Sequence, residues 1–133
     1  MTALYCDRAA ADAAVEKLKA YAQPQRLMIL SCLYEGERTV SEIDAATKIG
    51  QPALSQQLAE LRRADMVKTR RASKQVFYDL ASDTVRLCVR SMEAIFGGAS
   101  DPAAALQSAL RSDALATPVL KRPAGAAAFA KIN

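Results

Sequence analysis

The stretch around Gly50 constrains the fold of this chain more than any other feature of its 133 residues. Residues 41–49, which precede it, carry apolar side chains at helical spacing, and residues 51–64, which follow it, carry leucines at steps of four and three. Gly50 interrupts the pattern, because glycine is a poor helix former. Two short helices joined by a tight turn that contains glycine predict a helix-turn-helix unit.

Each of these two predicted helices has a defined start and an inward face. The spacing of Thr39 and Glu42 fits a capping box, and Pro52 is tolerated in the first turn of the second helix, where no amide hydrogen is needed. The side chains expected to point inward are Val40, Ile43 and Ala46, then Leu54, Leu58 and Leu61. The polar face of the second helix keeps side chains suited to base edges, which are Gln51, Ser55, Gln56, Gln57 and Arg62.

A basic cluster follows, with six cations in residues 62–74 that only Asp65 opposes within the segment. Its members are Arg62, Arg63, Lys68, Arg70, Arg71 and Lys74. Strands are predicted over 66–70 and 75–80, with residues 71–74 as the tip between them. A helix-turn-helix followed by a hairpin with a cationic tip is the winged-helix plan, and its concentrated positive charge suits a polyanion.

The predicted second strand has two distinct faces. Because side chains alternate along a strand, Val76 and Tyr78 share one face and Phe77 lies on the other. This alternation, in a run rich in β-branched and aromatic residues, supports the hairpin.

Further helices are predicted on both sides of this unit, over residues 8–22, from Pro24 to about Gly36, and from Ser82 or Asp83 to Phe96. The last has the clearest helical stripe, made of Val85, Cys88, Val89, Met92, Ile95 and Phe96. A winged helix of about eighty residues does not need this stripe for its own core, so we expect it to form a homodimer interface with the first helix.

The chain divides by composition into two parts. Residues 1–97 are expected to form the winged-helix DNA-binding and dimerisation domain. Residues 98–133 are rich in alanine and proline and read as a C-terminal tail, with one short helix over 103–111 and a mobile remainder.

Several functional classes are disfavoured. The chain has no histidine, which removes the commonest nitrogen ligand of transition metals and the usual general base. Three widely spaced cysteines do not suggest a disulfide framework. We therefore expect no catalytic residues, metal site or cofactor. The N-terminus does not read as a signal peptide and no apolar run approaches a membrane span, which predicts a cytoplasmic protein without membrane contact.

The arrangement resembles the ArsR/SmtB family of small dimeric winged-helix transcription regulators. The matching segments are QPQRLMILSCLYEGERTVSEI, QPALSQQLAELRRADMVKTRR and VFYDL, and the resemblance covers residues 18–96. It is most similar to the subgroup of BigR, SqrR, HlyU and NolR, whose members usually repress their targets. The resemblance implies a mainly α (α+β) fold, with a two-stranded β-hairpin wing and terminal helices in a dimer interface.

The resemblance also implies which residues contact DNA. Recognition-helix contacts fall on Gln51, Ser55 and Gln56, and wing contacts fall on residues 70–71 and 74–75. Gly50 stands where the family has a serine helix cap. With the rest of the polar face, the predicted DNA-binding set is Gln51, Pro52, Ser55, Gln56, Gln57, Arg62, Arg70, Arg71, Lys74 and Gln75.

Some members of the subgroup sense reactive sulfur or oxidants through two cysteines. The resemblance places that pair at Ser31 and near Gly97, whereas this chain has Cys32 and Cys88. On a helix, one residue rotates a side chain by about 100° and nine residues move it about 13 Å along the axis, so a copied dithiol is not expected. The candidate thiol sensors are Cys6, Cys32 and Cys88. Metal signatures of the family are absent, since Thr39-Val40-Ser41 stands where arsenic sensors carry C-x-C.

The expected function is that of a transcriptional repressor, not an enzyme, which binds an inverted-repeat operator in double-stranded DNA as a homodimer. Two inputs stay open: release by oxidation or persulfidation of cysteines, with the inducer unknown, or no small-molecule input at all. A dimeric protein-interaction module is the alternative from another class, and it would lack selective, salt-dependent operator binding.

Overall fold

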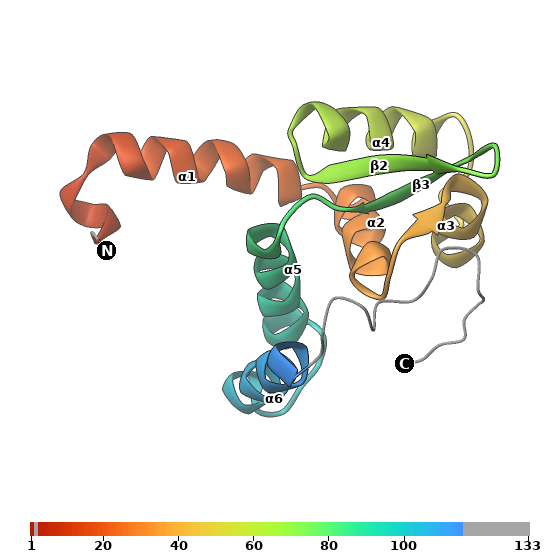
Figure 1. Cartoon of the computed structure of the whole chain (residues 1–133). Helices are drawn as coiled ribbons and strands as arrows, with labels where there is room; N and C mark the ends of the chain where they lie inside the picture. The colour runs from red at the N-terminus through yellow and green to blue at the C-terminus, as the bar shows by residue number, and fades with distance from the viewer. Residues whose placement is uncertain (2, 116–133) are drawn as a thin grey trace.

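The computed structural model describes residue 1 and residues 3–115. In this range the chain is mainly helical, with an antiparallel sheet in the order β1-β3-β2 (Figure 1). The elements in chain order are η1 Leu4–Cys6, α1 Arg8–Tyr21, α2 Pro24–Tyr34, β1 Arg38–Thr39, α3 Val40–Thr47, α4 Ala53–Arg63, β2 Val67–Ala72, β3 Gln75–Leu80, α5 Asp83–Phe96 and α6 Pro102–Leu115. The predicted helix-turn-helix (α3 and α4) and hairpin (β2 and β3) lie together at one end, and α6 lies at the other.

Side-chain caps define several helix starts. The Thr39 hydroxyl accepts from the Glu42 amide at 3.2 Å, and the Glu42 carboxylate accepts from the Thr39 amide at 2.9 Å, which confirms the predicted capping box. The Ser82 hydroxyl accepts from the Val85 amide at 3.2 Å and starts α5. These caps satisfy amides that a helix leaves without internal partners.

Helix α2 is the centre of the core. Its Ile29, Leu30 and Leu33 are fully buried, and it packs against α1, α3, α4, α5 and β3. The predicted inward residues Ile43 of α3 and Leu54, Leu58 and Leu61 of α4 are buried in the same cluster. Each buried side chain of this size contributes about 1.5–3 kcal/mol relative to exposure. The elements of the helix-turn-helix are thus held on one common support.

Two details of the predicted helices are wrong. Ala46, expected to point inward, is exposed, because Thr47 lies one turn beyond Ile43 and takes the half-buried position. Helix α4 begins at Ala53, two residues later than expected, and Pro52 is its N-cap residue.

The sheet has one more strand than expected. The hairpin is confirmed, with its turn at Ser73 and Lys74, whose φ angles of 51° and 66° are the left-handed values of a tight hairpin turn. Arg71 and Ala72 therefore belong to β2 and not to the tip. The two-residue strand β1 adds to the outer edge of β3 through the register Arg38↔Tyr78 and Thr39↔Phe77, so the predicted two-stranded wing is part of a three-stranded sheet.

The apolar stripe of α5 is buried in its first part and exposed in the last turn of the helix. Val85 and Val89 are buried, and Cys88 and Met92 pack against the core, so the expectation that the stripe serves no core is wrong. Its last turn leaves Ile95 57% and Phe96 81% exposed. Helix α5 ends at Phe96 as predicted, and Gly97 is its C-cap residue. A Cβ at Gly97 would lie 2.4 Å from the Glu93 carbonyl oxygen, so this position requires glycine.

Helix α6 extends the chain beyond the winged helix and packs against α5. The predicted helix over 103–111 is confirmed and is longer at both ends. The remainder of the predicted tail, residues 116–133, lies outside the described residues. In the part of the chain that the structure describes, no helix is long and apolar enough to cross a bilayer.

Candidate nucleic-acid interface

The turn between α3 and α4 sets the position of α4. Lys48 ends α3 in the left-handed region with φ 58°, and Gly50 has φ 84°, a value that favours glycine. The Gly50 amide donates to the Asp44 carboxylate at 2.9 Å. A Cβ at Gly50 would meet nothing within 4 Å, so the constraint is conformational. The Gln51–Pro52 peptide bond that follows is cis.

The outer face of α4 carries Ser55, Gln56, Ala59 and Arg62, all exposed. The Gln51 side-chain oxygen, just before the helix, accepts from the Ser55 hydroxyl at 2.7 Å and from the Ser55 amide at 3.2 Å. The Ser55 hydroxyl therefore has only acceptor capacity left, whereas the Gln51 amide group keeps its N–H donors. The side chain of Gln56 makes no hydrogen bond within the described residues.

Gln57 does not belong to this face. Its side chain is half-buried, and its amide oxygen accepts from Arg26 Nε at 2.9 Å, which ties α4 to α2. Arg26 is itself placed by the start of α2, where its amide donates to Gln23 Oε1 at 2.8 Å. The sequence pattern placed Gln57 with the polar residues of α4, but the structure gives it a partner inside the protein.

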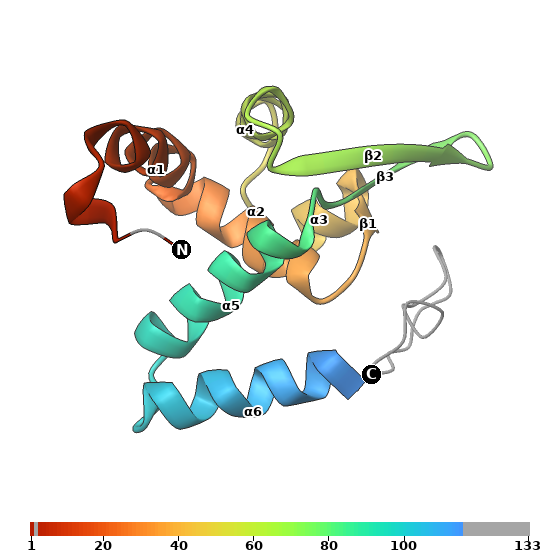
Figure 2. The same ribbon diagram turned by 60° about the vertical axis from the view of Figure 1, so that its left-hand side comes forward.

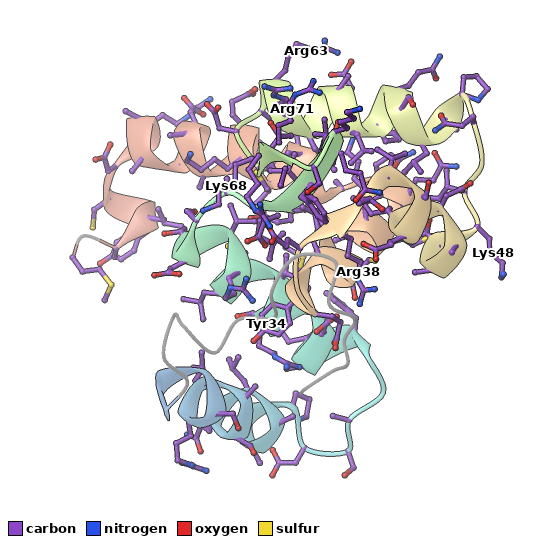
Figure 3. All side chains as sticks on the ribbon, turned by 45° about the vertical axis from the view of Figure 1, so that its right-hand side comes forward. Tyr34, Arg38, Lys48, Arg63, Lys68 and Arg71 are labelled. Atoms are coloured by element: carbon purple, nitrogen blue, oxygen red, sulfur yellow. The ribbon has the colours of Figure 1, made fainter. Side chains whose placement is uncertain are left out.

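The six cations of the basic cluster fall into two groups. Arg63 pairs with Glu60 one turn before it, and Arg70 pairs with Glu37 across 33 positions of sequence. The side chains of the other four make no hydrogen bond or ion pair among the described residues: Arg62, Lys68, Arg71 and Lys74. Figure 3 shows Arg63, Arg71 and Lys68 gathered at α4 and β2, apart from Lys48 at the α3–α4 turn.

Arg70 is held by more than one interaction. Its Nε lies 3.0 Å from Glu37 Oε2 and its Nη2 lies 2.5 Å from Glu37 Oε1, and its guanidinium carbon lies 4.8 Å from the centroid of the Phe77 ring. The hydrogen bonds that Arg70 donates to Glu37 raise the pKa of Arg70. The charge of Arg70 is thus largely offset inside the protein, unlike that of its neighbour Arg71.

The hairpin tip carries the remaining predicted contacts. Lys74 lies in the turn and Gln75 begins β3, and both are exposed. In Figure 2, where α4 is seen nearly end-on, the hairpin projects well beyond the helix. The tip of the hairpin therefore lies in a region that α4 does not reach.

A groove separates α4 from the sheet. It has a volume of about 430 Å³ and is lined by Val40, Ser55, Leu58, Ala59, Arg62, Arg63 and Tyr78. Tyr78, on β3, is half-buried and was not among the predicted site residues. The strand alternation places Tyr78 opposite Phe77, but no local pattern indicates that α4 lies beside it.

The three cysteines occupy different environments, and none forms a disulfide. Cys6 is exposed, whereas Cys32 and Cys88 are half-buried. Cys32 lines a second groove of about 500 Å³ between α2 and α3. Cys88 contacts Tyr21 at the end of α1; burial first, and then the hydrogen bond with the Cys88 thiol, raise the pKa of Tyr21.

A polar network joins α5 to α2 and to the hairpin. Arg86 and Arg90 lie against the Tyr34 ring, with guanidinium carbons 5.0 Å and 4.5 Å from its centroid. Arg86 also donates to the Tyr34 carbonyl at 3.1 Å and lies 3.8 Å from the Asp79 carboxylate of β3. Cations over an aromatic face are attracted by its quadrupole. Arg86 therefore links Tyr34 of α2 to Asp79 of β3.

The same network continues along α5 to Glu93. Its carboxylate accepts from the Ser31 hydroxyl of α2 and lies 3.4 Å from Arg90 Nη1. Ser31 is the position where the resemblance placed a sensing cysteine, and here it forms a hydrogen bond with a carboxylate. Over residue 1 and residues 3–115, no three Cys, Asp or Glu side chains gather in a way that could hold a metal ion.

Comparisons with known proteins agree with this geometry. Residues 23–69, which span α2, α3, α4 and the start of β2, match the model of the family described as bacterial regulatory protein, arsR family. The biofilm growth-associated repressor of Agrobacterium fabrum is 48% identical over 79 residues, which are 59% of this chain and 68% of that protein.

Two solved structures share the fold. The transcriptional repressor BigR from Xylella fastidiosa is 38% identical with a TM-score of 0.66, over 71% of this chain and 97% of that one. The homodimeric winged helix-turn-helix DNA-binding domain of Mb0332 from Mycobacterium bovis is 32% identical with a TM-score of 0.59, over 67% and 84% of the two chains. The predicted winged-helix fold is confirmed. The chain belongs to the arsR family of bacterial regulatory proteins and is a transcription regulator, not an enzyme.

Proposed function

We propose that this protein is a homodimeric repressor that binds an inverted-repeat operator in double-stranded DNA. The observation that carries the proposal is the set of unpaired cations along α4 and the hairpin: Arg62, Lys68, Arg71 and Lys74. Cations without protein partners remain available to phosphates, and the release of counterions from DNA then drives binding. The two α4 helices of the dimer enter successive major grooves, about one helical turn apart.

Base reading is assigned to the N-terminal part of α4. Gln56 is exposed and uncommitted, so its amide suits bidentate pairing with an adenine edge, worth about 1–3 kcal/mol of discrimination. Gln51 supplies its N–H donors, and Ser55 supplies an acceptor. Pro52, the N-cap residue of α4, is assigned to a packing contact with the same DNA strand.

Phosphate contacts are assigned to Arg62 on α4 and to Arg71, Lys74 and Gln75 on the hairpin. Such contacts set register and orientation on the duplex but carry no sequence information of their own. Glu37 accepts from Arg70 Nε and Nη2, so Arg70 contacts phosphate only through its remaining N–H groups. Its main role is to hold the hairpin in place.

The dimer interface is assigned to α1 and α5. These helices leave large apolar side chains exposed, which are Val15 and Leu18 on α1 and Leu87, Ile95 and Phe96 on α5. Exposed apolar surface of this kind marks an interaction site, and a second copy covers it in a two-fold pair. We assign DNA binding and dimerisation to residues 1–97, and α6 is an addition to this domain. We expect the protein to act in the cytoplasm.

For the input we propose modification of a thiol by an oxidant or reactive sulfur. Cys88 supports this, because it contacts Tyr21 where α1 meets α5, the two helices assigned to the dimer interface. A sulfur or oxygen added there pushes these helices apart and changes the spacing of the two α4 helices. Cys32 and Cys6 are the other candidates, and comparison of single serine variants separates the three.

The test is a gel shift with the full chain and DNA from upstream of its own gene, in the reduced, peroxide-treated and polysulfide-treated states. Binding that is selective, falls with salt and is lost after treatment supports the whole proposal. Equal binding in all three states excludes the thiol input and leaves control by abundance. A lack of selective binding together with a stable dimer favours the protein-interaction module.

A further inference from the structure

The groove between α4 and the sheet lies between the two parts that the proposed function places on DNA. Its α4 wall carries Ser55, Ala59 and Arg62, spaced i, i+4 and i+7 on one helix face. Tyr78 of β3 lines the opposite wall. In the sheet, Thr69 pairs with Tyr78, so Arg71, two residues along β2, shares the sheet face of Tyr78.

The shape of duplex DNA determines what must pass through this groove. One sugar-phosphate backbone separates each major groove from the adjacent minor groove. A protein that inserts α4 into the major groove and extends a hairpin past it straddles that backbone. We propose that the groove seats one phosphodiester of the DNA, held by the Tyr78 hydroxyl and the Arg62 guanidinium. This inference rests on the proposed function and adds Tyr78 to it.

The hydrogen bonds within the groove single out these two donors. The Ser55 hydroxyl already donates to Gln51 Oε1, and Arg63 is paired with Glu60. The side chains of Tyr78 and Arg62 make no hydrogen bond or ion pair among the described residues, and both line the groove. Hydrogen bonds to a phosphate oxygen are strengthened by its charge, so a phosphodiester satisfies both donors at once.

Ala59 supplies the space between them. It is exposed on α4 and lines the groove, and its methyl group leaves room for a backbone to approach. A large side chain at this position fills the groove without removing any charge or donor.

The first test measures affinity over a salt series by fluorescence anisotropy, with a duplex selected by the wild-type protein from a random pool and with an unrelated duplex. Tyr78→Phe is expected to weaken binding to both duplexes by about tenfold and to leave the salt slope unchanged, because a phenol releases no counterion. Arg62→Ala is expected to weaken both and to reduce the slope by about 1. Tyr5→Phe, at an exposed tyrosine of η1, is the matched control and is expected to bind like the wild type.

The second test fills the groove. Ala59→Leu is expected to weaken binding to both duplexes at least tenfold with no change in melting temperature, whereas Ala59→Ser, which adds one oxygen atom, retains binding. Because Ala59 is exposed, the two variants differ in the groove and not in the core. This pair also keeps the inference testable if Tyr78→Phe folds poorly.

The third test locates the phosphate. Neutral methylphosphonates are placed singly along the selected duplex, and one position in each half-site is expected to weaken the wild type about tenfold. The same position is expected to weaken Tyr78→Phe by a smaller factor, because only the Arg62 contact is left to lose. If Tyr78→Phe and Ala59→Leu bind like the wild type while Arg62→Ala and Arg71→Ala do not, the groove does not seat the backbone and the proposed function stands. If the wild type binds no duplex selectively, the proposed function itself fails.

Discussion

The Arg70 guanidinium donates to both carboxylate oxygens of Glu37, a residue 33 positions earlier in the sequence. Glu37 comes just before β1 and Arg70 lies on β2, on opposite sides of β3. The same guanidinium lies over the Phe77 ring of β3. One side chain of β2 therefore contacts both β3 and the segment just before β1.

Arg70→Ala and Arg71→Ala are expected to have different effects although the residues are adjacent. Loss of Arg70 removes the bidentate pair and the ring contact, which destabilises the fold by about 1 kcal/mol and weakens DNA binding with little change in salt slope. Loss of Arg71, whose side chain has no partner among the described residues, leaves stability unchanged and reduces the slope by about 1. Urea unfolding and a salt series of binding constants measure the two effects. If Arg70→Ala reduces the salt slope by about 1 and leaves stability unchanged, the assignment is contradicted.

Gln56→Ala and Gln57→Ala form a second matched pair on α4. Gln56 is exposed and assigned to a base edge, so its loss is expected to reduce discrimination between selected and unrelated duplexes by about tenfold at unchanged stability. Gln57 binds Arg26 Nε, so its loss is expected to cost about 1 kcal/mol of stability and to leave discrimination intact. Selectivity ratios and thermal unfolding distinguish the two residues. Intact discrimination in Gln56→Ala removes that glutamine from the reading surface.

Local periodicity predicted most of the fold for a physical reason. A helix that must bury one face repeats its apolar residues every three or four positions, and Leu54, Leu58 and Leu61 are all buried as that rule requires. The hairpin was predicted from alternation and the caps from spacing. Strand β1 was not, because two residues carry no period, and Arg38 and Thr39 form a strand only by pairing with β3.

Pair contacts within the site were beyond the reach of the sequence pattern. A helical pattern tells which face a residue occupies but not which element lies opposite. Gln57 and Arg26 are 31 positions apart, and Ser31 and Glu93 are 62 apart. The six cations looked equivalent in sequence, and only the fold brings Glu37 to Arg70. For the same reason the sequence pattern did not indicate Tyr78, whose position beside α4 depends on how the sheet packs.

The end of α5 tests the dimer interface. Phe96→Glu is expected to convert the dimer to a monomer, because the substitution places a charge on apolar surface that the partner must cover, while the exposed side chain contributes little to the core. Operator affinity is expected to fall by two orders of magnitude or more, since both half-sites are needed. Thr84→Glu, at an exposed position in the first turn of α5, is the control. Light scattering gives the mass, and an unchanged dimer mass for Phe96→Glu moves the interface elsewhere.

The junction of α1 and α5 predicts a pH dependence of stability. Burial of Tyr21, and then its hydrogen bond with Cys88, raise the pKa of Tyr21 from its ordinary value of 10.0. The folded protein therefore holds this proton over a range in which the unfolded chain has lost it. The stabilisation is complete below about pH 10 and decreases above it by up to ~1.4 kcal/mol per pH unit.

Tyr21→Phe has no proton to lose, so its free energy of unfolding is expected to fall less steeply than that of the wild type between about pH 9 and pH 11. Urea unfolding measures this, with Tyr5→Phe, at an exposed tyrosine, expected to follow the wild type. Equal slopes for Tyr21→Phe and the wild type show that the Tyr21 phenol is not buried against Cys88 in solution.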